Sequence, residues 1–371
     1  MNLPARPTAR RGGIPLGRPF GVPVYLAPSW LFIAAFVIAG AGAEPAVARL
    51  GAARWVVAVG AALIVAVSIV AHELGHAAVS MALGVPVRRI TVFLLGGLAE
   101  IEREPETPVG EYLVAIAGPL VSLVLAGAGV LGWRLAPEDS APAVLAFYLA
   151  AVNTGVALLN LMPGLPLDGG RVLRAAVWQV TRDKLRSTTV AVRGGQVIAC
   201  AVLALGAWEL SAGRGNGVIT LVVGAFLWVA SIATLHQART ASRIPGVSAA
   251  GLVRPAITVT ADVPLAEALR KAHDANARLL VVDAYGRPSG VISAAAVQAV
   301  PAHRFPWVTV GSVTAPVTGA STVNVGLAGE ALIESLQARP ADEYVVVDDS
   351  GSVIGVLAAR DVVRVVQGAA R

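Results

Sequence analysis

Residues 67–81 read VSIVAHELGHAAVSM, which places three ionisable side chains within an apolar run long enough to cross a membrane. Residues four apart on an α-helix are separated by about 40° around the axis and about 6 Å along it. His72 and His76 therefore lie on one face and can share a metal ion, and the adjacent Glu73 can accept a proton from water. The alternative is a pair of histidines near a helix end, with Glu73 paired to a loop arginine. Ionisable groups inside a span are costly and usually functional, so the pattern favours a metal site.

The composition indicates a membrane protein. Of 371 residues, 56% are hydrophobic and 14% are charged, against about 25% charged residues in an ordinary soluble domain. This balance excludes a disordered chain and argues against a wholly soluble enzyme. The single cysteine, Cys200, excludes an internal disulfide and any multi-cysteine metal site. Nitrogen and oxygen ligands must therefore hold any metal.

The net charge of +6 belongs to the hydrophobic part of the chain. Residues 246–371 carry 10 basic and 11 acidic side chains, which leaves 19 basic and 12 acidic side chains before them. Positive charge beside apolar spans sets membrane orientation, so no nucleic-acid partner is expected. With the N-terminus in the cytosol, the inside segments hold fifteen arginines and lysines and the outside loops hold four. Both termini are therefore predicted to be cytoplasmic.

Six apolar runs are long enough to cross about 30 Å of hydrocarbon. The predicted fold is a polytopic α-helical membrane protein of about six transmembrane helices, followed by a soluble α/β tail. Residues 41–43 (AGA) resemble a signal-peptidase site, which leaves open whether the first span is retained. The basic stretch 171–186 predicts a cytosolic surface or interface helix. The predicted spans are 22–43, 56–81, 112–133, 141–162, 195–208 with its flanks, and 218–235.

A catalytic zinc site needs a third protein ligand and an open position. Residues 160–170 read NLMPGLPLDGG and offer Asp168. The second and fourth spans both run inward, so His72, His76 and Asp168 should come to a similar depth near the cytosolic side. The alternative is that the prolines, Asp168 and the two glycines form only a turn and a helix cap. The histidine pair elsewhere in the chain, which still needs a third ligand, favours the metal site.

The C-terminal part contains an internal repeat with an offset of 65 residues. VVDAYG at 281–286 recurs as VVDDSG at 346–351. Each copy reads as strand, helix, strand, tight turn, strand and helix. A unit this short buries little core alone, so the two copies should pack together. The expected domains are a cytoplasmic segment at 1–21, a membrane domain at 22–235, a linker at 236–246, and soluble repeats at 247–300 and 307–368.

The HELGH motif, residues 160–170 and the AGPL sequence at 117–120 together resemble the site-2 protease family of intramembrane zinc metalloproteases. The match covers about residues 21–235. This resemblance implies one catalytic zinc ion held by His72, His76 and Asp168, with Glu73 as the general base. It also implies that Asn160 stabilises the oxyanion. The tail resembles a pair of cystathionine-β-synthase (CBS) domains, which one branch of that family carries.

A substrate that arrives as a transmembrane helix must unwind before it is cut, and its freed backbone groups then need hydrogen-bond partners. Residues 91–100 read TVFLLGGLAE, an apolar, β-prone stretch just after the second span. We expect a re-entrant hairpin with a hinge at Gly96 and Gly97, whose edge pairs with the extended substrate. An ordinary loop at the membrane interface is equally compatible with these residues.

CBS pairs commonly bind adenine nucleotides between their repeats, through a Gly-x-x-Ser/Thr-x-x-Asp stretch. The resemblance therefore implies a nucleotide site, but the motif is split here. The first repeat has Ser293 but Ala296 at the acidic position, and the second has Asp361 but Ala358 at the hydroxyl position. The alternative is a dimerisation or docking module that binds no small molecule. A homodimer through the CBS domains stays open in either case.

The sequence therefore predicts an intramembrane zinc metalloendopeptidase that performs regulated intramembrane proteolysis, in contact with membrane lipid and with its tail as a regulator. Its substrates would be proteins anchored by a transmembrane segment. The alanine-rich composition, with more arginine than lysine, is typical of bacteria, so a multi-pass protein of a bacterial plasma membrane is expected. The alternative is a CBS-regulated channel or transporter in which His72, Glu73 and His76 line an ion path. That alternative predicts no stoichiometric zinc and leaves residues 160–170 unexplained.

Overall fold

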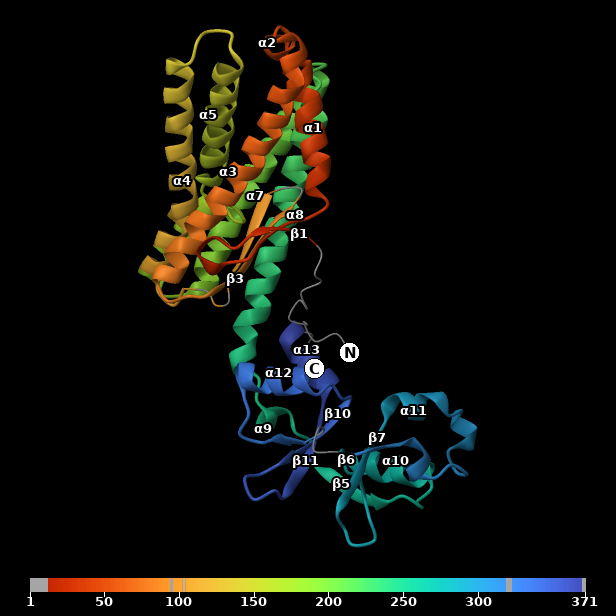
Figure 1. The fold of residues 1–371 in the computed structure, drawn as a ribbon. Coiled ribbons are helices and arrows are strands. Elements are labelled where there is room, and N and C mark those ends of the chain that lie inside the picture. Colours follow the sequence, from red (N-terminus) through yellow and green to blue (C-terminus); the bar gives the residue numbers. More distant parts are fainter. Residues whose placement is uncertain (1–12, 94–95, 102, 104, 318–321, 369–371) are drawn as a thin grey trace. The chain divides into compact units, whose positions relative to one another are not determined.

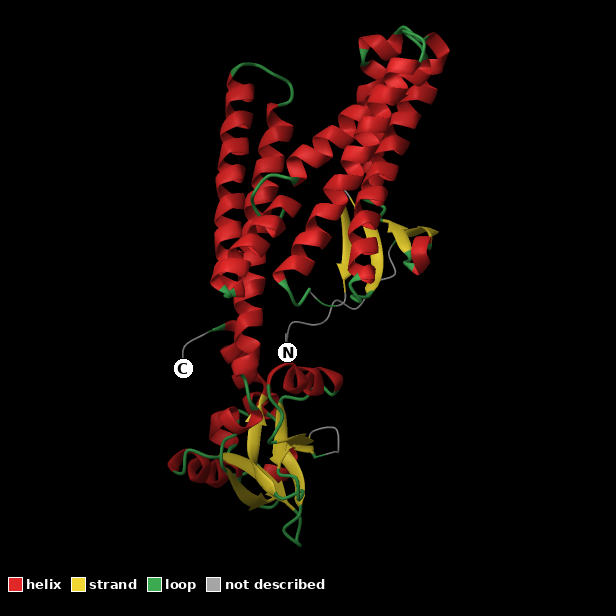
Figure 2. Cartoon of the chain, turned by 90° about the vertical axis from the view of Figure 1, so that its left-hand side faces the viewer, coloured by secondary structure: helices red, strands yellow, loops and turns green. Residues whose placement is uncertain are grey.

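The chain folds into two compact units, one spanning Arg10–His236 and the other formed mostly by Gln237–Arg371 (Figure 1). The structure is a computed structural model that describes residues 13–93, 96–101, 103, 105–317 and 322–368. The first unit is mainly helical, and the second mixes short helices with strands (Figure 2). The apolar and the polar parts of the sequence therefore belong to separate structural units.

Within the described residues of the first unit, five helices are long and apolar enough to cross a membrane. The shortest has 20 residues, which corresponds to about 30 Å at about 1.5 Å per residue. Large apolar side chains such as Leu63, Val67 and Val124 are exposed on these helices, as expected where the surrounding solvent is lipid. The predicted polytopic α-helical membrane fold is confirmed. The five helices are α3 (Arg54–Ala82), α4 (Pro108–Leu135), α5 (Ala141–Asn160), α7 (Lys184–Ser211) and α8 (Gly217–Arg243).

The count of six spans is not confirmed, because the predicted span at 22–43 is not one long helix. It comprises strand β2 (Val24–Leu26) and helix α1 (Trp30–Ala43). Pro23 and Pro28 flank the strand, and proline disfavours a helical conformation at the residue before it. The 14 residues of α1 reach only about 21 Å. This helix alone is therefore too short to cross the hydrocarbon layer.

The predicted fifth span lies within α7, whereas the basic stretch before it is arranged differently from the prediction. Helix α6 (Asp168–Thr181) ends where Arg182 adopts a left-handed conformation, with φ 54°. Helix α7 then begins at Lys184, whose preceding residue Asp183 accepts a hydrogen bond from the backbone N–H of Arg186. Such a capping residue satisfies a backbone donor that has no partner within the helix. The basic stretch is therefore divided between two helices.

A four-stranded sheet packs beside α3 (Figure 2). It has the order β1-β2-β3-β4 and includes β1 (Ile14–Gly17), β3 (Val87–Phe93) and β4 (Gly96–Ile101). Strands β2 and β3 are parallel, and the other two pairs are antiparallel. Val24 and Ile90 of the sheet share a buried cluster with Ala77 of α3. This packing places β4, an edge strand, against the helix that carries HELGH.

Strands β3 and β4 form a hairpin in the stretch for which the sequence left a hairpin and an interfacial loop open. The predicted Gly-Gly hinge is wrong, because Gly96 and Gly97 lie in β4 and pair with Phe93 and Val92. Residues 94–95, which join the two strands, lie outside the described residues. The glycines therefore belong to the edge strand rather than to the turn.

The second unit has the repeated strand and helix order that the sequence predicts. Its two sheets have the orders β5-β6-β7-β8 and β11-β10-β9. Leu280 and Val291 of the first copy share a buried cluster with Val345 and Val356 of the second, so the two copies pack together as expected. The elements are β5 (Ala256–Thr260), α10 (Leu265–Asp274), β6 (Arg278–Val282), β7 (Pro288–Ile292), α11 (Ala294–Ala299), β8 (Thr314–Pro316), β9 (Thr322–Asn324), α12 (Gly329–Ala338), β10 (Glu343–Val347), β11 (Val353–Ala358) and α13 (Ala359–Gln367).

Short helical turns connect these elements. They are α2 (Pro45–Ala48) and α9 (Ala249–Leu252), together with five 3₁₀ turns at Pro19–Gly21, Gly51–Ala53, Ile244–Gly246, Ala302–Arg304 and Val310–Val313.

Candidate metal centre

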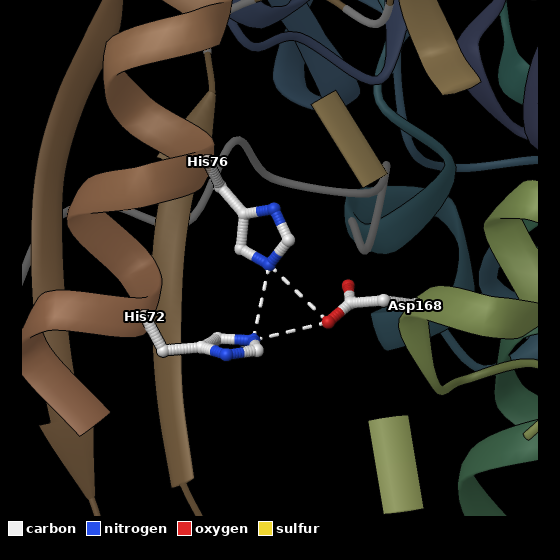
Figure 3. A group of neighbouring side chains, drawn as sticks. All are labelled: His72, His76 and Asp168. Atoms are coloured by element: carbon white, nitrogen blue, oxygen red, sulfur yellow. Dashed lines mark hydrogen bonds and ion pairs between the residues drawn. The ribbon is translucent and has the colours of Figure 1, made fainter. Parts of the chain in front are cut away.

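Two histidines of α3 and one aspartate of α6 point toward a common centre (Figure 3). The Nε2 atoms of His72 and His76 lie 3.1 and 3.2 Å from Oδ2 of Asp168. The two Nε2 atoms are 3.2 Å from each other. Both histidines are buried, with 5% and 4% of their surface exposed. Residues separated by more than 90 positions in the sequence are thereby brought within one coordination sphere.

The spacing of these three atoms fits a tetrahedral zinc site. With zinc–ligand distances of about 2.0–2.1 Å, neighbouring ligand atoms of a tetrahedron lie about 3.3 Å apart. All three observed separations are close to that value. Two imidazole nitrogens and one carboxylate oxygen also form a donor set typical of catalytic zinc, which keeps a fourth position for water or substrate. The three residues therefore fit the metal by both chemistry and geometry.

Helix α4 orients both imidazole rings. His76 Nδ1 donates a hydrogen bond of 2.6 Å to the carbonyl oxygen of Val114, and a carbonyl can only accept. The proton of the neutral ring is therefore on Nδ1, which leaves the Nε2 lone pair directed at Asp168. His72 Nδ1 lies 3.0 Å from the hydroxyl oxygen of Ser122. Such outer contacts hold metal-binding rings in place and set their tautomer.

Gly118 makes room for the two rings on α4. A Cβ atom at this position would collide with the Nε2 atoms of both His72 and His76. Val114, Gly118 and Ser122 are spaced four residues apart, so one face of α4 supplies a carbonyl, a space and a hydroxyl in succession. This face of α4 contacts the face of α3 that carries His72 and His76.

Asp168 is the first residue of α6, and its carboxylate is directed at the histidines (Figure 3). The position before the helix is occupied by Leu167, so Asp168 does not act as the cap that the alternative assignment requires. Gly169 and Gly170 pack tightly against the backbone of the preceding loop, where a Cβ atom would meet Leu161 and Leu165. The glycines therefore allow the loop to fold closely over the start of α6.

Glu73 lies between the histidines and the edge strand β4. Its Oε2 accepts a hydrogen bond of 3.2 Å from the backbone N–H of Ala99. A Cβ atom on Gly97 would collide with the Glu73 side chain, so the absence of a side chain at Gly97 makes space for the carboxylate. The candidate general base thus contacts a strand edge that can bind an extended peptide.

The remaining predicted site residues lie on other elements. Asn160 is the half-buried last residue of α5. Ser293 caps α11 by accepting a hydrogen bond from the backbone N–H of Ala296. Asp361 is buried in the second unit, where Arg278 Nη2 donates to its Oδ2 at 3.2 Å.

Arg278 also contacts Glu343 at 2.9 Å, so it joins the first repeat to two acids of the second. Burial raises the pKa of Glu343, and the nearby charge of Arg278 opposes that shift. Asp361, the carboxylate expected to bind a nucleotide ribose, is therefore part of an ion-pair network with Arg278 and Glu343.

Sequence reasoning missed the residues that support the metal ligands. Ser122 was not singled out, and Arg174 lies in the stretch predicted as a surface helix. The structure instead buries Arg174 on α6, where it pairs with Glu111 of α4. The sequence does place Glu111, Gly118 and Ser122 on one face of a helix. This spacing identifies them as supporting residues only when the helices that pack against that face are known.

The chain matches peptidase family M50 over residues 60–138 and 135–203, and the CBS domain over residues 249–299. A protein of Synechocystis sp. that is named as a zinc metalloprotease, sll0528, is 33% identical over 370 residues, which cover 96% of each chain. The chain belongs to peptidase family M50. The resemblance to the site-2 protease and CBS families is thereby confirmed.

Two further proteins are similar to this chain. A Mycobacterium tuberculosis protein named as the zinc metalloprotease Rip3 is 31% identical over 374 residues, which cover 96% of this chain and 93% of the relative. The solved structure of the site-2 protease from Methanocaldococcus jannaschii is 25% identical, with a TM-score of 0.44, and covers 60% of this chain and 95% of that chain.

We predict that Gly118→Ala abolishes metal binding by this M50 chain. The added methyl group would occupy the space of both Nε2 atoms, so the rings can no longer converge. The measurement is metal content of the purified protein by mass spectrometry. Gly127→Ala is the matched control, because a Cβ at this other α4 glycine meets nothing within 4 Å in the described part of the chain. Equal metal content in both variants would contradict the assignment.

Proposed function

We propose that this chain is an intramembrane zinc endopeptidase that hydrolyses peptide bonds within or near the transmembrane segments of membrane-anchored proteins. The observation that carries the proposal is the convergence of His72, His76 and Asp168 on one point, beside Glu73. Membership of family M50 and the names of its relatives support the same activity. A channel or transporter has no need for a carboxylate at ligand distance from both histidines.

The residues of this chain divide the reaction among them. Zinc, when bound by the three ligands, supplies a Lewis acid that polarises the scissile carbonyl and acidifies the attacking water. Glu73 accepts the proton that water loses as its oxygen attacks the carbonyl carbon, and then passes this proton to the leaving amine nitrogen as the C–N bond breaks. Asn160 is proposed to donate a hydrogen bond to the oxyanion that develops on the carbonyl. Val114 and Ser122 keep the rings oriented throughout.

The free edge of β4 is proposed to present the substrate. Ala99 directs its N–H away from β3 and toward Glu73. In a strand, the backbone groups of alternate residues point the same way, so Gly97 also directs its N–H and C=O outward. An unwound substrate segment that pairs with this edge satisfies its backbone groups inside the membrane. The same pairing brings its peptide bonds next to Glu73.

The apolar and basic residues of the chain support a position and an orientation in the membrane. Lipid surrounds the exposed apolar faces of the spanning helices. The excess of arginine and lysine on one side supports cytoplasmic N- and C-termini in a bacterial plasma membrane. The CBS pair is proposed to regulate cleavage, either through a nucleotide or through assembly of a homodimer.

A cavity of about 270 Å³ in the second unit supports the nucleotide version of this regulation. It lies between elements of the two repeats, and Ser293 and Asp361 directly follow two of its lining residues, Ile292 and Arg360. Binding of a ribose by Asp361 requires its carboxylate to exchange the Arg278 guanidinium for sugar hydroxyls. Other lining residues are Leu269, Arg278, Val297 and Glu343.

The first prediction from the proposed activity is that Glu73→Gln retains zinc but loses cleavage by at least about 10²-fold, the scale of a general-base contribution. Glutamine keeps the size of the side chain and removes its capacity to take a proton. Zinc content and cleavage of a reporter with a transmembrane segment are measured together. Asp168→Ala is the comparison, because it should lose the metal as well as the activity. Full cleavage by Glu73→Gln would overturn the assignment of the base.

A second prediction concerns the edge of β4. Ala99→Pro removes the outward N–H while sparing the hydrogen bonds to β3, so cleavage of the transmembrane reporter should fall more than tenfold with zinc content unchanged. Ala99→Val keeps the N–H and serves as the matched control. If the two variants cleave the reporter equally well, the substrate does not pair with this edge.

The third prediction concerns the tail. Titration of ATP and AMP into the full chain should release heat of binding, and Asp361→Asn should weaken the affinity at least tenfold, or about 1.4 kcal/mol. Asp262→Asn, an exposed aspartate of the same unit, is the control. Absence of binding by either nucleotide would favour the docking-module alternative.

A further inference from the structure

A buried ion pair links the helix that supports the histidines to the helix that carries Asp168. Glu111 of α4 is completely buried, and Arg174 of α6 is 8% exposed. Arg174 Nε donates a hydrogen bond of 2.6 Å to Glu111 Oε1, and its Nη2 contacts the same oxygen. The catalytic steps proposed above use neither residue. The pair therefore needs another explanation.

The position of Glu111 connects it to the metal ligands. Glu111, Val114, Gly118 and Ser122 follow one another at spacings of three or four residues, so they share one face of α4. That face provides the carbonyl for His76, the space for both rings and the hydroxyl near His72. The carboxylate of Glu111 extends this supporting face by one more turn.

The position of Arg174 connects the pair to the third ligand. Arg174 follows Asp168 by six residues, which is about 9 Å along α6. A contact at this distance sets both the depth and the rotation of the helix start. The planar guanidinium approaches one carboxylate oxygen through two nitrogens, so it restrains orientation as well as distance.

Stabilisation of the fold does not by itself explain why this ion pair is present. A buried ion pair must recover the cost of removing two charges from water, and well-packed apolar residues often stabilise a fold equally well. Glu111 Oε2 has no hydrogen-bond partner among the residues that the structure describes, which adds to that cost. A directional contact is favoured where geometry matters more than stability.

We propose that the Glu111–Arg174 pair is a positioning device that sets α6 against α4, and so delivers Asp168 Oδ2 to the two histidine nitrogens. This inference rests on the proposed zinc-dependent function. Arg174 and Glu111 act through Asp168 and do not touch the reacting atoms. Loss of either side chain lets the start of α6 shift, and the third ligand then meets the metal in altered geometry.

The test measures metal binding rather than cleavage. Zinc affinity of the purified full chain is determined by competition with a chelator, and the visible spectrum of the Co²⁺-substituted protein reports coordination geometry. Glu111→Gln and Arg174→Lys should each lower zinc affinity by about tenfold, the lower end of the effect of losing a direct outer partner of a metal ligand, because the pair acts on Asp168 through α6. Their Co²⁺ spectra should also change in band position and intensity.

Glu209→Gln is the matched control, since Glu209 accepts a 2.6 Å hydrogen bond from Thr220 and so links α7 to α8 instead. It makes the same chemical change in the membrane unit and should leave zinc affinity and the Co²⁺ spectrum unchanged. Thermal unfolding of each variant is followed in parallel.

The reversed pair, Glu111→Arg with Arg174→Glu, keeps the proposal testable even if the single variants fail to fold. Recovery of zinc affinity in this double variant, relative to either single variant, supports positioning by the pair. Wild-type affinity and spectrum in both folded single variants, or a folded double variant without zinc affinity, overturns it. Absence of zinc binding by the wild-type chain instead overturns the proposed function itself.

Discussion

The convergence of two imidazole nitrogens and one carboxylate oxygen is the constraint on which the rest of the membrane unit depends. His72 and His76 come from one helix and Asp168 from the start of another, and their ligand atoms are about 3 Å apart. With both histidines neutral and Asp168 ionised, as metal binding requires, three lone pairs at that spacing repel one another unless a cation lies among them. The fold must therefore hold them together against their own electrostatics. The contacts of α4 and the close packing around the Asp-Gly-Gly turn do this.

The membrane setting explains why the polar groups around this centre are paired. Lipid offers no hydrogen bonds, so a buried donor or acceptor without a partner in the protein is costly. His72 and His76 have partners on α4, Glu73 has one on β4, and Asn153 of α5 donates to Ser68, one turn before His72. These contacts join α3 to its neighbours along the side that carries the chemistry. The polar network and the apolar packing thus specify the same arrangement.

The soluble unit follows a different principle. Its two repeats bury a shared apolar cluster, and Arg278 of the first repeat contacts two acids of the second. A largely buried ion pair must recover the cost of removing its charges from water, so the apolar cluster supplies most of the cohesion between the repeats. Arg278 instead pairs with the carboxylate of Asp361, which a nucleotide ribose would need. A nucleotide that uses Asp361, as proposed above, would compete with a contact that joins the two repeats.

Much of the candidate site was evident from the sequence, because its residues belong to patterns of neighbouring positions. The spacing of His72 and His76 on a helix, the apolar length of the spans and the repeated VVD segments each depend on residues near one another in the chain. The predicted first span contains a strand and a helix of 14 residues, an arrangement that hydropathy alone does not distinguish from one long helix. The glycine hinge failed because Gly96 and Gly97 pair with β3, although Gly96 has a positive φ of 143° that favours glycine.

The sequence by itself determined the metal-binding residue types, the membrane class and the two-part organisation. Only the tertiary structure decided that Asp168 faces the histidines, that Ser122 and the Val114 carbonyl orient them, and that Arg174 is buried against Glu111. The physical reason is that helical periodicity is a property of neighbouring residues. The approach of α3, α4, α6 and β4 depends on packing between segments that the sequence places far apart.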